Sequence, residues 1–186
     1  MAGLVVMCVE ALVLASVGAT AALVPVFPAP ERLMVDYLPT PAIGVGSPNP
    51  LFTFSPVTLP DDRNVSVADA RVIVVSSLTG KMFWDSGYVA MNGTSWGIRC
   101  TQALPEGQAF YWTASWRSSD GRASAVSSPA RFVTDIWSKD AWDEASWVGA
   151  GHGEFRTQFN LDSIDNLDAF AFVASPGGVR AIVHKI

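Results

Sequence analysis

The side chains with the greatest capacity for chemistry form one acidic group, Asp140, Asp143 and Glu144. Carboxylates can bind calcium, but a calcium loop supplies its oxygen ligands at alternating positions around a central glycine, and this spacing lacks both features. A solvated acidic turn is therefore favoured over a calcium site. The two histidines, His152 and His184, have no further ligand at the spacing of a metal site. We expect no metal and no cofactor.

Motifs for nucleophilic or phosphate chemistry are missing as well. The sequence contains no G-x-S-x-G and no glycine-rich phosphate loop followed by a helix. Asp85-Ser86-Gly87 could offer a polar site, yet aspartate close before glycine usually makes a turn through a side-chain-to-backbone bond. Arg71 and Arg117 are expected to pair with nearby acidic residues. The sequence therefore predicts no catalytic residue.

Two sequons are candidates for N-glycosylation, with Asn64 and Asn92 as the acceptors. Both lie in turn-like sequence, where an acceptor asparagine would be exposed, but sequons are also common by chance. The two sequons can therefore be either glycosylation sites or chance occurrences, and both interpretations stay open.

Residues 1–24 are predicted to be a secretory signal peptide, because residues 4–26 are nearly all apolar and end in small residues typical of cleavage. Two alternatives stay open: an uncleaved signal anchor, since the run is just long enough to span a bilayer, and a translation start assigned too far upstream. We expect a secreted, extracellular protein, anchored to a membrane only if this segment is retained. Cys8 would be removed with it, and the remaining Cys100 is expected to be a buried apolar side chain.

Any functional side chain here must be positioned by β-strands. Phe110, Trp112, Ala114 and Trp116 alternate with more polar residues, which places the two sets on opposite faces of a strand. Asp120-Gly121 follows as a tight hairpin turn. Together with Ala130–Val133 and earlier runs, this gives about seven short strands in roughly 100 residues, the outline of a sandwich. The earlier runs are Leu33–Leu38, Leu51–Ser55, Asp69–Ser76, Phe83–Gly87 and Thr94–Cys100.

The fold class is therefore all-β. We expect an immunoglobulin- or fibronectin-III-like antiparallel sandwich over residues 32–135, after an exposed, extended, Pro-rich spacer at 25–31. Pro39–Pro50 is predicted to be a loop. A Trp-rich connector at 136–150 carries Trp137, Trp142 and Trp147, whose indoles are expected to pack into a seam between domains. A sugar-stacking platform is the alternative.

Residues 151–186 are predicted to begin a second, truncated β-sandwich, with Pro176-Gly177-Gly178 as one of its turns. Two and a half strands cannot form an independently stable sandwich. We therefore expect the sequence to be a fragment or a truncated gene product.

The order of these segments resembles a known family. LMVDYL, PNPLFTFS, ARVIVVSS, FWDSG, FYWTASWRSSDGRASAVSSPARFVT, ASWVG and FRTQF follow one another as in the N-terminal region of bacterial-type α-L-rhamnosidases. FWDSG and YWTASWRSSDGR are the most specific of these motifs. The resemblance covers residues 32–186 and implies a fibronectin-III-like domain, then a β-sandwich N-terminal module, then a catalytic (α/α)6 barrel. The family's catalytic carboxylates lie on that barrel, so none carries over to this chain.

The leading hypothesis is a non-catalytic N-terminal accessory portion of a secreted α-L-rhamnosidase-like glycoside hydrolase, inactive alone. Its expected partners are the missing C-terminal catalytic barrel of the same protein and rhamnose-containing glycans. A stand-alone secreted module that binds glycans or a protein is the alternative. The net charge of −5 and the lack of a basic run exclude nucleic acid as an expected partner.

Overall fold

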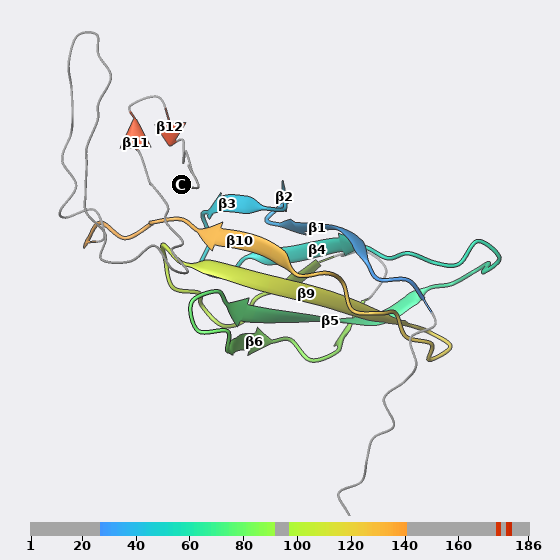
Figure 1. Cartoon of the computed structure of the whole chain (residues 1–186). Helices are drawn as coiled ribbons and strands as arrows, with labels where there is room; N and C mark the ends of the chain where they lie inside the picture. Colours follow the sequence, from blue (N-terminus) through green and yellow to red (C-terminus); the bar gives the residue numbers. More distant parts are fainter. Residues whose placement is uncertain (1–26, 92–96, 141–173, 176–177, 180–186) are drawn as a thin grey trace, which may run out of the picture.

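The computed structural model describes residues 27–91, 97–140, 174–175 and 178–179, and no α-helix occurs in these ranges (Figure 1). Two sheets build the main body. The strand order is β2-β1-β4-β8 in the first sheet and β3-β10-β9-β5-β6 in the second, where β7 also pairs with β5. The first sheet contains β1 (Glu31–Val35), β2 (Leu38–Pro39), β4 (Leu51–Ser55) and β8 (Gly97–Arg99). The second contains β3 (Ala42–Val45), β5 (Val67–Ser76), β6 (Met82–Asp85), β7 (Val89–Ala90), β9 (Ala109–Ser118) and β10 (Ala130–Thr134).

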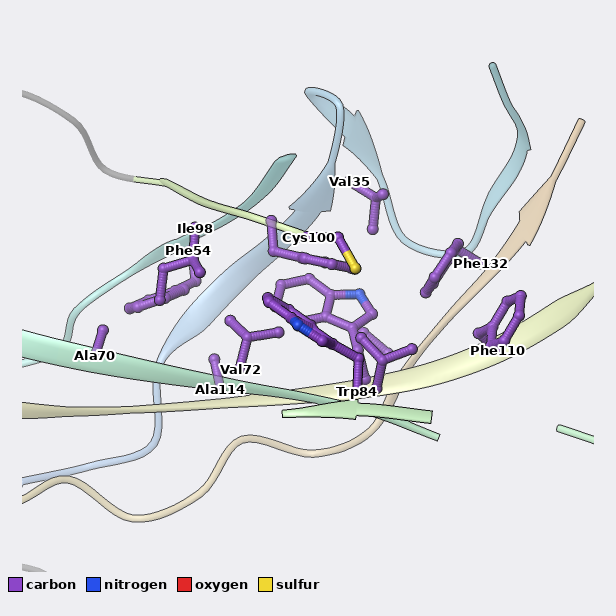
Figure 2. Close-up of a cluster of buried hydrophobic side chains, with 14 of the residues drawn as sticks. Val35, Phe54, Ala70, Val72, Trp84, Ile98, Cys100, Phe110, Ala114 and Phe132 are labelled. Carbon is purple, nitrogen blue, oxygen red and sulfur yellow. The ribbon is translucent and has the colours of Figure 1, made fainter. Parts of the chain in front are cut away.

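The inner face of β9 supplies the largest side chains of the core. Its residues Phe110, Trp112, Ala114 and Trp116 are at most 1% exposed, as their period of two predicts. Side chains from both sheets join them in one buried cluster, part of which Figure 2 shows around Trp84 and Cys100. The all-β sandwich expected from the sequence is therefore confirmed.

Aromatic rings join the two sheets across this core. Phe52 of β4 lies with its ring centroid 4.8 Å from that of Trp112 and 5.6 Å from that of Phe132 on β10. Phe110 stacks on Phe132 at 5.4 Å. These separations are typical of favourable ring pairs, so large apolar side chains hold the layers together.

The region predicted to be one strand, Leu33–Leu38, is instead a small hairpin. β1 ends at Val35 and pairs with β2 across a turn at Asp36 and Tyr37, which have φ angles of 47° and 64°. Two consecutive positive φ angles are typical of a two-residue hairpin turn. The Asp36 carboxylate also accepts a hydrogen bond from the Leu51 N–H at 2.8 Å.

The predicted loop Pro39–Pro50 contains a strand that sequence reasoning missed. β3 pairs with β10 in parallel, with Ala42 opposite Phe132 and Ile43 opposite Val133. The proline and glycine residues around it hid the strand, although Ala42 and Val45 are buried. The second sheet is therefore mixed, with β3 and β10 parallel and its other pairs antiparallel.

The described part of the predicted spacer, residues 27–30, is not an exposed linker. Phe27 is 2% exposed and stacks on Trp116 with 4.6 Å between ring centroids. Its N–H donates to the Ala123 carbonyl at 3.1 Å, and its carbonyl accepts from the Ala125 N–H at 2.9 Å. Phe27 is thus part of the folded sandwich.

The predicted second sandwich, 151–186, lies almost wholly outside the described residues. Within it, β11 (Ala174–Ser175) pairs antiparallel with β12 (Gly178–Val179). The connector at 136–150 is described only as far as Asp140, and the segment 1–24 not at all. The boundaries proposed for these regions stay predictions.

Candidate functional site

Two arginine–aspartate pairs lie on the outer face of the second sheet. Arg71 on β5 donates through Nε to Asp85 Oδ1 of β6 at 2.9 Å and also bonds Oδ2. Arg117 on β9 donates through Nε to Asp69 Oδ1 at 2.7 Å, and its guanidinium carbon lies 3.8 Å from the centre of the Tyr88 ring. The expected pairing of both arginines with acidic residues is confirmed.

The Arg71 guanidinium, with further help from the Gly87 N–H, lowers the pKa of the Asp85 carboxyl below its usual range. A general acid needs the opposite, a raised pKa that keeps its proton near neutral pH. Asp85 is therefore held as an ionised structural partner.

The Asp85-Ser86-Gly87 segment forms the turn that the sequence predicts. Asp85 Oδ1 accepts from the Gly87 N–H at 2.9 Å, and Gly87 has a φ of 61°. Ser86 Oγ accepts from the Val72 N–H at 2.9 Å, and the Ser86 N–H donates to the Val72 carbonyl at 3.0 Å. These polar atoms are used within the fold.

A third charged group was missed by sequence reasoning. Arg122 donates to Asp120 Oδ2 through Nε at 2.8 Å and to both carboxylate oxygens of Asp62 through Nη1 at 2.9 Å. Its guanidinium carbon also lies 4.6 Å from the centre of the Phe27 ring. Asp62 is distant in sequence from Arg122, so no local spacing could have indicated the pair.

The metal prediction is testable only in part. Within residues 27–91 and 97–140, no three His, Cys, Asp or Glu side chains are grouped so that they could bind a metal ion. The candidates Asp143, Glu144, His152 and His184 lie outside the described residues. Cys100 is 1% exposed, and burial raises the pKa of its thiol.

Of the two glycosylation candidates, only Asn64 lies in the described part of the chain. Asn64 is exposed and has a φ of 61°. The hydroxyl of Ser66, the third residue of its sequon, lies 2.8 Å from that of Ser119. Asn92 lies in the undescribed range 92–96.

Trp137 is the one connector tryptophan in the described residues, since Trp142 and Trp147 lie beyond Asp140. The residue is 39% exposed, and its backbone N–H donates to Glu106 Oε2 at 2.9 Å. Both interpretations of the connector, a domain seam and a sugar platform, are compatible with this position.

No helix in the part of the chain that the structure describes is long and apolar enough to cross a lipid bilayer.

The chain has been compared with known proteins. A sequence model described as "Rha78A-like, N-terminal immunoglobulin domain" matches residues 30–138. No curated protein matches the chain.

Several solved structures are similar to the chain. The α-L-rhamnosidase of Dictyoglumus thermophilum shares 25% identity with it at a TM-score of 0.54, over 62% of this chain. The α-L-rhamnosidase of Streptomyces avermitilis, complexed with L-rhamnose, shares 19% at a TM-score of 0.53, also over 62%. The enzyme of Aspergillus terreus shares 13% at a TM-score of 0.52, over 63%. The chain spans only 13%, 11% and 13% of the lengths of these three proteins, respectively.

Proposed function

Because the chain belongs to the family of Rha78A-like N-terminal immunoglobulin domains, we propose that it is the non-catalytic N-terminal accessory part of a secreted α-L-rhamnosidase-like glycoside hydrolase. The main support is the family match over residues 30–138. In addition, acidic residues on the outer face of the sandwich are hydrogen-bonded to arginines. Its role is to brace or present a catalytic barrel that the same gene encodes.

Three carboxyl groups in the described residues support a role without catalysis. Glycoside hydrolysis uses two carboxyl groups, one of which must keep its proton near neutral pH. Hydrogen bonds lower the pKa of Asp85, Glu106 and Asp120 instead. For Asp85 the donor is Arg71, whereas Ser138 and Ser118 donate to the other two.

The direct test incubates the purified chain with a chromogenic α-L-rhamnoside. We expect no release of the chromophore above a buffer blank, and turnover that scales with protein concentration would overturn the proposal.

Reading the nucleotide sequence beyond the codon for Ile186 tests the accessory role. An in-frame helical barrel supports it, and its absence supports a stand-alone module.

A stand-alone glycan-binding module is the second candidate. The exposed indole of Trp137 favours it, because aromatic faces suit sugar rings. Titration of the ¹⁵N-labelled chain with L-rhamnose would shift the Trp137 indole N–H signal if this function holds. D-glucose serves as the control sugar, and unchanged signals with both would exclude rhamnose binding at this residue.

The proposed secretion leads to two further expectations: removal of the N-terminal segment and glycosylation of Asn64. Mass spectrometry of the protein expressed with its own N-terminus should show the loss of residues 1–24, and an intact N-terminus in the membrane fraction would indicate an anchor. In a eukaryotic host, Asn64→Gln should remove one glycan from the secreted protein. An unchanged glycan mass would exclude Asn64 as an acceptor.

A further inference from the structure

One carboxylate holds the segment by which the chain leaves the sandwich. After β10 ends at Thr134, Glu106 Oε2 accepts from the backbone N–H of Trp137 at 2.9 Å and of Ser138 at 2.8 Å. Glu106 Oε1 accepts from the Ser138 hydroxyl. Three donors from two neighbouring residues therefore meet a single side chain.

The residues just before this contact are fixed to the same loop. Thr134 Oγ1 accepts from the Gln108 N–H at 2.9 Å and donates to the Pro105 carbonyl at 2.8 Å. The Gly107 N–H donates to the Asp135 carbonyl at 3.1 Å, and the Asp135 N–H donates to Val45 of β3 at 2.9 Å. Thr134, Asp135, Trp137 and Ser138 are thus each bonded to the 105–108 loop or to β3, whereas the Ile136 N–H donates to the Asp135 carboxylate.

The bonds to Glu106 lie beyond the last strand, whereas the Asp135 bonds to Val45 and Gly107 continue the pairing of β10 with β3 and β9. Trp137 and Ser138 belong to no strand, and both of their backbone N–H groups bond to Glu106. Hydrogen bonds to an ionised carboxylate are shorter and stronger than those between neutral groups. They also lower the pKa of Glu106, the Ser138 hydroxyl contributing most, so the acceptor is charged at neutral pH.

We propose that Glu106 is a positioning residue that immobilises Trp137 and Ser138, so that the chain leaves the sandwich in one fixed direction instead of through a free linker. The rigid unit ends at Ser138, four residues beyond the last strand. This holds whether or not the full-length protein hydrolyses a rhamnoside, because it concerns the junction alone.

The three lysines of the chain, Lys81, Lys139 and Lys185, allow a sharp test with a lysine-specific protease. Cleavage after Lys139 requires Trp137 and Ser138 to detach from Glu106 and bind in the protease active site. Its rate therefore reports the fraction of molecules in which this segment is detached. Cleavage after Lys81, in the exposed β5–β6 turn, monitors the rest of the sandwich. Intact mass spectrometry of the full chain follows both products over time.

Glu106→Ala is expected to speed cleavage after Lys139 by about three- to tenfold, because all three bonds are lost. Ser138→Ala should speed it less, since both backbone donors remain. Glu31→Gln removes a charge from an exposed position on β1 and should change neither rate. Equal Lys139 rates in wild type and Glu106→Ala would overturn the proposal. So would a rise of the same factor at Lys81, which would indicate general destabilisation.

Discussion

At one end of the sandwich Phe27 is 2% exposed, whereas at the other end Trp137 keeps 39% of its surface exposed. Phe27 is held by its ring, which stacks on Trp116. Trp137 is held by its backbone, which bonds to Glu106. Both aromatic residues flank the strands, but only the first contributes to the core.

This difference predicts how each end responds to perturbation. Removing a buried ring destabilises the entire domain, because a cavity remains in a closely packed interior. Removing hydrogen bonds between partly exposed groups beyond the last strand frees only a local segment. The Phe27 end should therefore unfold with the whole sandwich, and the Glu106 end should open alone.

The largest expected effect is that of Phe27→Ala. Loss of the buried ring should lower the free energy of unfolding by about 3–5 kcal/mol, measured by urea denaturation of the full chain followed by circular dichroism. Val126→Ala, at a side chain that is 61% exposed, is the control and should cost less than about 0.5 kcal/mol. Equal effects of the two changes would show that Phe27 is not part of the cooperative unit.

A smaller effect is expected from Thr134→Val, just before the Glu106 end. Valine fills the buried site but lacks the hydroxyl that bonds Gln108 and Pro105. We therefore expect the free energy of unfolding, measured by urea denaturation, to fall by about 1–2 kcal/mol. Thr113→Val, on the half-buried outer face of β9, is the matched control. A neutral result for Thr134→Val would mean that this hydroxyl does not stabilise the junction.

The Glu106 end should also open in acid. The folded-state pKa of Glu106 is lowered, chiefly by the Ser138 hydroxyl, so its contribution is complete above the unfolded value of about 4.3 and is lost as the pH falls through the lowered pKa. Hydrogen exchange at the Trp137 and Ser138 amides should lose protection in this window. In Glu106→Gln the protection of these amides should be weak at every pH. If the variant and the wild type had the same pH profile, Glu106 would not be the group that controls this opening.

The smallest effect is expected at the charged group beside Phe27. Asp62→Asn removes one of the two carboxylates that bond Arg122, whose side chain is 33% exposed, and partly exposed ion pairs contribute little. We expect the Tm to fall by no more than about 2–3 °C. A larger fall would indicate that this ion pair, as well as the buried ring, holds the Phe27 end.

Local patterns were sufficient for the parts of the fold that depend on local chemistry. The alternation in β9 encodes its buried face directly, and Asp85-Ser86-Gly87 forms its turn from neighbouring atoms. Arg71 and Arg117 were expected to pair with nearby acidic residues, but their actual partners, Asp85 and Asp69, are set by the pairing of strands.

Three of the missed features depend on partners distant in sequence, unlike the local hairpin turn at Asp36 and Tyr37. Phe27 is buried because Trp116 and residues 123–125 receive it, and nothing near Phe27 indicates this. β3 is short and flanked by proline and glycine, so only its pairing with β10 defines it. The sequence around Glu106 is that of an ordinary loop, and only the folded structure shows that Trp137 lies beside it.

The parallel pairing of β3 with β10 also constrains the order of assembly. β3 lies near the start of the sandwich and β10 at its end, so this contact closes almost the entire domain into a loop. Contacts of such long range slow folding. During synthesis, the sandwich cannot be completed until Thr134 has left the ribosome, and until then β9 presents an unpaired edge to which chaperones or other nascent chains could bind.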